Sequence, residues 1–293
     1  MAEKTENKSV LRMIIPQWQG GVNPNYVFGS ELLACIAPTA PNTETVRIQV
    51  DTDFEKKLDQ IDGIDGGDIL LKQMRETRDI LREKSPDKVI VFGGDCSVTQ
   101  VPFDYLRGKY KEEIGIIWLD AHPDISGPSA SSHLHEMPLA NLLGQNRESE
   151  ITCSENIYEA DKIFLAGLIE ERLRDMDMAC KELNIRIASP EELEENSSAV
   201  LNWIHETGVK YVAVHWDLDV LSPEDFRCIY PAEPYTDADE FPAAVGRMTL
   251  KGIGRLLSDV SGYAEIVGLS VTEHLPWDAM NLRAALGSIS IFK

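Results

Sequence analysis

Two clusters of acidic residues, one of them with a histidine, directly follow apolar stretches of this sequence. The stretch IGIIWL is followed by Asp120, His122 and Asp124, and the stretch VAVHW by Asp217 and Asp219. Alternate residues of an extended chain point to the same side, so each cluster can converge on one point. Carboxylates that crowd together repel each other strongly unless cations lie among them. The pattern therefore predicts a site for one or two divalent metal ions.

Two more apolar stretches end in residues of the same kind. VIVFGG is followed by Asp95 and Cys96, and VGLSVT by Glu273. Ligands of open α/β sheets bind beyond the carboxyl ends of the strands, so all four endings are candidates for one site. A single Asp at such a place is more often a helix cap or a loop residue. The combination of D-x-H-x-D with D-x-D favours metal binding, and carboxylates with one or two nitrogen ligands suit manganese or a similar ion.

Strands and helices must alternate along the chain to place these endings side by side. Helical spacing of apolar residues predicts helices over residues 67–84, 170–183, 190–206 and 239–257. The stretch APTAPNTE predicts an early loop. Continuous apolar runs are typical of parallel strands covered on both faces, and the sequence has eight: VLRMII, TVRIQV, KVIVFGG, IGIIWLD, KIFLAGL, IRIAS, KYVAVHWDLDV and AEIVGLSV. We expect a single α/β domain over residues 1–293, with helices on both sides of a parallel sheet.

The charge, the cysteines and the apolar runs of the sequence indicate which partners and which cellular compartment to expect. The chain has 49 acidic and 28 basic side chains, a formal net charge of −21, which disfavours nucleic acid as a partner. The negative electrostatic field of such a chain weakly favours a small cationic substrate. A solvated acidic surface that aids solubility is the simpler explanation of the charge. The five cysteines form no C-x-x-C pair, the first ten residues lack the apolar core of a signal peptide, and no apolar run approaches membrane-spanning length. We expect a cytoplasmic protein without a membrane partner.

Five motifs occur in an order that resembles the ureohydrolase family, the arginases and agmatinases. The match spans about Phe92 to Pro276, and the motifs read GGDCS at 93–97, DAHPD at 120–124, HEMP at 135–138, HWDLDVLSP at 215–223 and EHLP at 273–276. The resemblance implies a three-layer α/β/α sandwich with a mainly parallel eight-stranded sheet. It implies hydrolysis of a guanidino or amidine C–N bond by metal-activated hydroxide, with release of urea or a similar product. It also implies two manganese ions and a homo-oligomer, trimeric or hexameric.

The resemblance assigns a role to each acidic residue of the clusters. Asp120 and Asp217 would bridge two metal ions. His122 and Asp219 would complete one site. Asp124 and the residue at position 96 would complete the other, and as a metal ligand Asp124 is also counted as a catalytic residue.

The same resemblance assigns the substrate contacts. His135 would be the histidine that protonates the leaving amine, its alternative being a surface loop residue. Glu273 would be the catalytic and substrate-binding carboxylate that holds the planar guanidinium group, its alternative being a solvent-facing strand end. Ser126 and Ser131 lie where arginases hold the amino-acid end of their substrate, and we take them as candidate substrate contacts.

The chain departs from the family pattern at a metal-ligand position, because Cys96 replaces histidine. A thiolate is softer than an imidazole and shifts preference from manganese toward zinc, cobalt, iron or nickel. Cys96 could bind a different metal, lie as an inert buried thiol, or be replaced as a ligand by another residue. His215, two residues before Asp217, is a candidate for that replacement. The interpretation that we favour from the sequence is a hydrogen-bonded core histidine, because His215 lies deeper along its strand.

Two other departures concern the substrate. Glu136 replaces the glycine after the family's histidine and adds charge at the mouth of the predicted pocket, and Ser222 replaces the aspartate of the last D-P pair. The segment ISGPSASSHLHE between Asp124 and His135 also matches the arginases poorly, which argues against arginine as the substrate. The leading hypothesis is a metal-dependent hydrolase of a guanidino or amidine C–N bond. The alternatives are a single-metal amide or amidine hydrolase, which would use Asp120, His122 and Asp219, and a catalytically impaired family member that acts as a binding subunit.

Overall fold

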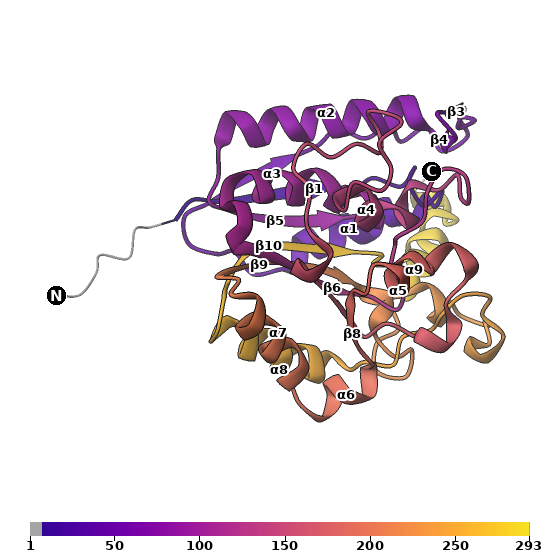
Figure 1. Cartoon of the computed structure of the whole chain (residues 1–293). Helices are drawn as coiled ribbons and strands as arrows, with labels where there is room; N and C mark the ends of the chain where they lie inside the picture. Colours follow the sequence, from indigo (N-terminus) through magenta and orange to yellow (C-terminus); the bar gives the residue numbers. More distant parts are fainter. Residues whose placement is uncertain (1–7, 293) are drawn as a thin grey trace.

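The computed structural model of the chain describes residues 8–292 and has one eight-stranded sheet at its centre (Figure 1). The strand order is β2-β1-β5-β10-β9-β6-β7-β8, and every neighbouring pair runs parallel. The bounds are β1 (Val10–Ile15), β2 (Thr43–Arg47), β5 (Lys88–Gly93), β6 (Ile114–Leu119), β7 (Ile163–Ala166), β8 (Arg186–Ala188), β9 (Tyr211–Asp217) and β10 (Glu265–Thr272). Each predicted run contributes one strand, which confirms the predicted α/β class. A separate hairpin joins β3 (Gln60–Ile61) to β4 (Ile64–Asp65).

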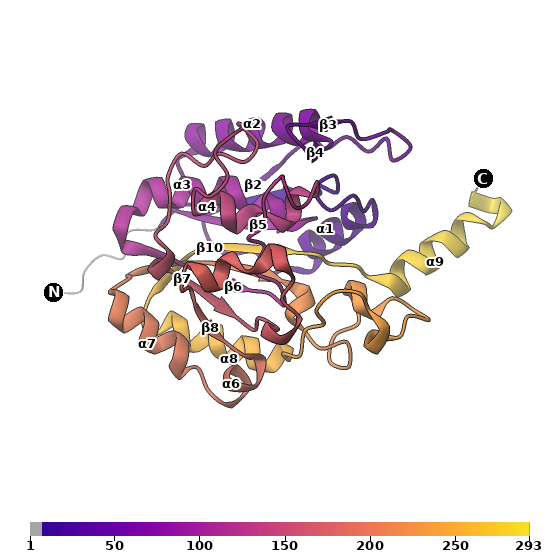
Figure 2. The same ribbon diagram turned by 45° about the vertical axis from the view of Figure 1, so that its right-hand side comes forward.

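Helices cover both faces of the sheet. One face carries α2 (Gly67–Lys84), α3 (Gln100–Tyr110), α4 (Pro138–Leu142) and α5 (Ala179–Glu182); the other carries α1 (Asn25–Ile36), α6 (Pro190–Glu195), α7 (Ser198–Thr207) and α8 (Leu250–Ser261). The last helix, α9 (Trp277–Gly287), projects away from this body (Figure 2). No helix within residues 8–292 combines the length and the apolar character needed to cross a membrane.

The core has two layers because side chains alternate across the sheet. Along β6, Ile116 and Trp118 belong to the apolar cluster under α2 and α3, whereas Ile117 and Leu119 belong to the cluster under α7 and α8. A strand buried on both faces needs apolar residues at every position, which is why β6 is apolar throughout.

The helix predictions are confirmed in one case and corrected in three. Helix α2 spans the predicted residues 67–84. The predicted helix 190–206 is two helices, α6 and α7, because Asn196 is extended. Residues 239–249 precede α8, which begins only after Thr249 caps the Gly252 N–H. Within 170–183, single 3₁₀ turns precede α5, since the Asp177 carboxylate bonds the Arg174 N–H and starts a new turn.

Candidate metal and active site

The candidate site lies where the four central strands end. The strands β5, β10, β9 and β6 are consecutive in the sheet, and the segments that follow them carry the residues singled out in the sequence (Figure 1). They border a cleft of about 320 Å³. Its lining includes Tyr26, Cys96, His122, Asp124, His133, His135, Glu136, Arg174, Asp217, Asp219, Tyr230 and Glu273.

One group of ligand atoms comes from Asp120, His122 and Asp219. His122 Nδ1 lies 3.1 Å from Asp219 Oδ2 and 3.4 Å from Asp120 Oδ1. The Trp118 indole donates to Asp120 Oδ2 at 3.1 Å and holds that carboxylate in place. The three ligand atoms are within 4.8 Å of one another, close enough to surround one ion.

The convergence follows from turns after the strands and not from extended chain. Asp120 accepts a hydrogen bond from the His122 N–H at 2.7 Å, and Asp217 accepts one from the Asp219 N–H at 2.7 Å. Each aspartate therefore closes a tight turn with its own side chain. The predicted convergence is found only in part: Asp120 groups with His122 in one set and with Asp124 in another, whereas no set joins Asp217 to Asp219 among the described residues. Our physical reason, an extended chain, was wrong.

The second group is centred on Cys96. Its thiol donates to Asp217 Oδ2 at 2.8 Å and lies 3.7 Å from Glu273 Oε1. The side chain is 2% exposed. Asp95 on the same loop does not join the group, because it accepts bonds from Ser97, Gly20 and Gln17 and anchors the loop.

A third set brings Cys96, Asp120, Asp124 and His215 together, all four buried and with ligand atoms within 4.8 Å of one another. Asp124 Oδ2 and His215 Nε2 are buried and have no hydrogen-bond partner among the described residues. An unpaired buried polar atom costs about 1–3 kcal/mol, so two such atoms in one set fit a ligand that both would contact.

The electrostatics of the cluster also fit a cation. Burial raises the pKa of Asp120 to about 7, and the Asp219 carboxylate adds to that effect. Burial and neighbouring carboxylates raise the pKa of Asp124 and of Asp217 as well. Burial opposes the charging of His122, yet the Asp219 and Asp120 carboxylates raise its pKa. The ionised carboxylates are therefore costly by themselves, and a divalent cation would offset that cost.

His135 and Glu273 face each other across the cleft. His135 Nδ1 lies 3.4 Å from Glu273 Oε1. Burial and then the nearby Glu273 carboxylate raise the pKa of the Tyr26 hydroxyl, which lines the same cleft. Burial lowers the pKa of His135, but the hydrogen bond and charge of Glu273, together with the Glu136 and Asp95 carboxylates, outweigh burial, so the net pKa is raised. Tyr26 comes from α1, which no sequence motif marked, so sequence reasoning missed it.

Glu136 lies at the cleft, where its carboxylate forms an ion pair with Arg174 at 2.6 Å. Arg174 also binds Asp177 and was not singled out from the sequence. Ser131 donates to the Glu136 carboxylate, and Ser126 donates to the Glu136 carbonyl at 2.9 Å. Both hydroxyls support the loop, and neither serine is among the described residues that line the cleft. Their role as substrate contacts stays a prediction.

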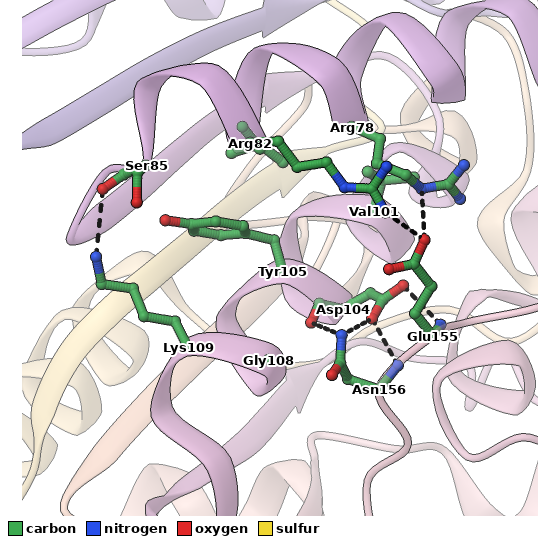
Figure 3. A pocket seen from close by; sticks show the side chains of 11 residues that line it. Arg78, Arg82, Ser85, Val101, Asp104, Tyr105, Gly108, Lys109, Glu155 and Asn156 are labelled. Carbon is green, nitrogen blue, oxygen red and sulfur yellow. Dashed lines mark hydrogen bonds and ion pairs between the residues drawn. The ribbon is translucent and has the colours of Figure 1, made fainter.

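A second cavity, of about 290 Å³, lies between α2 and α3 (Figure 3). Its charged side chains pair with one another or with backbone. Glu155 binds Arg78 and Arg82, Asp104 accepts from Asn156, and Lys109 donates to the Ser85 carbonyl. With these partners in place, its charged groups do not point to a ligand, and the candidate site remains the cleft at the strand ends.

Comparison with known proteins identifies the family of the chain. The sequence profile of the arginase family matches residues 36–228 of the chain. The chain belongs to the arginase family. Arginase of Staphylococcus aureus strain COL is 27% identical over 145 residues, 46% of this chain and 46% of that protein. Arginase of Emericella nidulans is 34% identical over 100 residues, 32% of this chain and 31% of that protein. The chain therefore matches these curated relatives over less than half of their length.

Solved arginase-family structures share the fold over nearly the whole chain. Entamoeba histolytica arginase in complex with L-ornithine superposes with a TM-score of 0.74 at 18% identity, covering 92% of this chain and 91% of that one. Bacillus caldovelox arginase gives 0.70 at 18% identity, covering 97% and 99%. Proclavaminate amidino hydrolase of Streptomyces clavuligerus gives 0.65 at 17% identity, covering 92% and 84%. At these identities the likeness establishes the fold.

Proposed function

We propose that this protein is a metal-dependent hydrolase that cleaves a C–N bond of a guanidino or amidine group. One observation carries the proposal: nitrogen, oxygen and sulfur ligand atoms from four adjacent strand ends converge in buried or half-buried groups small enough to hold ions. The unpaired Asp124 Oδ2 supports it, because that oxygen has no other partner among residues 8–292. Membership of the arginase family supports the class of reaction.

The ligand sets divide into two neighbouring positions. We assign His122 and Asp219 to one position and Asp124 and Cys96 to the other. Asp120 belongs to a ligand set of each position, and Asp217, which contacts Cys96, would be the second bridging carboxylate. A divalent ion bound there would act as a Lewis acid and lower the pKa of water to about 7, so that a nucleophile exists at neutral pH. Cys96 favours zinc, cobalt, iron or nickel over manganese in its position.

The remaining residues bind the substrate and move protons. Glu273 accepts hydrogen bonds from the planar amidino group, whose N–H donors match a carboxylate in pairs. The Tyr26 hydroxyl lines the same cleft close to Glu273 and would hold that carboxylate in place. His135 lies beside Glu273 and delivers a proton to the departing amine. The Glu136–Arg174 pair borders the same cleft and would contact the rest of the substrate.

The direct test is release of urea or a related product from a panel of arginine, agmatine, guanidinobutyrate and simple amidines. The metal-free chain would be loaded with manganese, zinc, cobalt or nickel in separate assays. We expect turnover of at least one compound, and loss of both turnover and bound metal in Asp217→Asn, which removes a charge shared by the cluster. Asp79→Asn, an exposed change on α2, is the matched control.

The outcomes distinguish the alternatives. If no compound of the panel is cleaved although two ions are bound per chain, the proposed substrate class is wrong. One bound ion with cleavage of amides would favour the single-metal hydrolase, and no bound ion would favour a binding subunit. Assembly into trimers or hexamers and a cytoplasmic location stay predictions. Helix α9, with exposed Leu282 and Leu286, offers an apolar surface for such assembly.

A further inference from the structure

His215 is a fully buried histidine with one ring nitrogen paired and the other unpaired. Its Nδ1 lies 2.9 Å from Thr99 Oγ1, which in turn lies 2.8 Å from Ser270 Oγ. Its Nε2 has no hydrogen-bond partner among the described residues, and the Asp120 Oδ2 atom 3.9 Å away is too far for one. A hydrogen-bonded core histidine, our interpretation from the sequence, accounts for Nδ1 alone.

The surroundings fix the direction of the ring. Its plane stacks on Trp118, its register partner on β6, with ring centroids 3.8 Å apart and an interplanar angle of 24°. Thr99 closes the 3₁₀ turn Cys96–Thr99, so the turn that carries the thiol also holds the imidazole. A metal-binding histidine typically donates its second ring N–H to such a partner. In the tautomer whose Nδ1–H donates to Thr99 Oγ1, Nε2 carries the lone pair, and we assign that tautomer to the metal-bound state.

The distances suit one ion. Ligand atoms of Cys96, Asp120, Asp124 and His215 all lie within 4.8 Å of one another. Atoms that bind a common ion at about 2.0–2.3 Å are separated by roughly 3.3–4.6 Å, so only small movements are needed. The two unpaired atoms of the set, Asp124 Oδ2 and His215 Nε2, would both gain a partner.

We propose that Cys96 Sγ, His215 Nε2 and the carboxylates of Asp120 and Asp124 form a single four-ligand site for zinc or cobalt. The proposal deepens the proposed function and rests on it, because it defines one of its two metal positions. His215 supplies the imidazole that Cys96 replaces in the family motif, from a different strand. The thiol proton that now points to Asp217 leaves when the sulfur binds the ion. One sulfur, one nitrogen and two oxygen ligands select zinc or cobalt over manganese.

Cobalt titration of the metal-free full chain tests the site. We expect two ions per chain, one of which produces a near-ultraviolet sulfur-to-cobalt charge-transfer band. His215→Gln should weaken the ion that produces this band by at least about tenfold and change its visible spectrum, with the other ion retained. His274→Gln is the matched control, because His274 is also buried but its Nδ1 bonds the Gly29 carbonyl outside the cluster.

Cys96→Ser should remove the sulfur-to-cobalt charge-transfer band and shift the metal preference of the site toward manganese. If His215→Gln does not fold, the site can be tested in the wild-type chain by NMR, with ¹⁵N-labelled histidine and bound ¹¹³Cd. Cadmium coupling to two imidazoles, those of His122 and His215, supports the site; coupling to His122 alone overturns it. Unchanged cobalt affinity and spectrum in His215→Gln would also overturn it and leave the proposed function standing. Failure of the wild-type chain to bind any ion would overturn both.

Discussion

Asp124 and Glu273 adopt left-handed backbone conformations, with φ of 45° and 62°. Few residues other than glycine do so, and each instance costs about 1–3 kcal/mol that the surrounding structure must offset. The Asp124 carbonyl accepts the Leu139 N–H at 3.1 Å, and the Glu273 N–H donates to the Gly94 carbonyl at 2.8 Å. Backbone contacts thus hold both side chains in orientations that the sequence motifs do not specify. Strain at two site residues is typical of a preorganised active site.

His135 is the residue to test for proton transfer. His135→Asn should lower kcat by roughly 10²–10⁴-fold, because the general acid for the leaving amine is lost. Metal content should stay unchanged, since His135 belongs to neither of the two proposed metal positions and its contact is Glu273, to which we assign substrate binding. Steady-state kinetics and elemental analysis of the same samples check this. His205→Asn on the exposed side of α7 is the control. A parallel fall in bound metal would mean that His135 supports the site structurally.

At the scale of elements, strands were predictable and helix ends were not. Continuous apolar runs predicted all eight strands of the sheet, because burial on both faces leaves little freedom in sequence. Helical periodicity predicted α2 but ran through Asn196, whose extended conformation separates α6 from α7. The periodicity of a sequence does not show where a side chain will cap a new turn.

The candidate site was predictable to a similar extent. The strand-end motifs predicted that these residues share one site, and the resemblance to ureohydrolases grouped Asp120 with His122 and Asp219, which the structure also brings together. Tyr26 and Arg174 escaped prediction because they reach the cleft from elements far away in the sequence. The unpaired Nε2 of His215 was also beyond the sequence, since a hydrogen bond can be counted only once the neighbours are placed.

Gly94 tests the loop that carries Cys96. A Cβ atom at Gly94 would lie 1.7 Å from the Gln17 carbonyl oxygen, so the two backbones can approach only without a side chain. Gly94→Ala should lower the free energy of unfolding by about 3 kcal/mol and weaken metal binding, because the loop must shift. At Gly254 on α8 an added Cβ atom would meet nothing within 4 Å, so Gly254→Ala should instead raise the free energy of unfolding by up to about 1 kcal/mol. Denaturant unfolding of both variants gives the two values; equal effects would refute the argument.

At the scale of the whole molecule, the candidate ligands bring together the ends of the central strands of the sheet. They follow β5, β10, β9 and β6, four consecutive strands that bring together segments from Cys96 to Glu273. The chain also carries a formal net charge of −21, and its buried carboxylates add to the repulsion. Divalent cations at this point would neutralise charge and tie the ends of the central strands together.

Metal removal should therefore lower the stability of the entire domain and not only that of the loops. An ion that binds the folded chain alone adds about 2.7 kcal/mol at a free concentration 100 times its Kd. For a chain of this size each kcal/mol shifts Tm by about 2–4 °C, so chelation should lower Tm by several degrees. Calorimetry of the metal-free and metal-loaded chain measures the shift, and Asp217→Asn, with a ligand of the cluster removed, should show much less of it. If Tm is the same with and without metal while ions are bound, these residues do not form the stabilising centre that their convergence indicates.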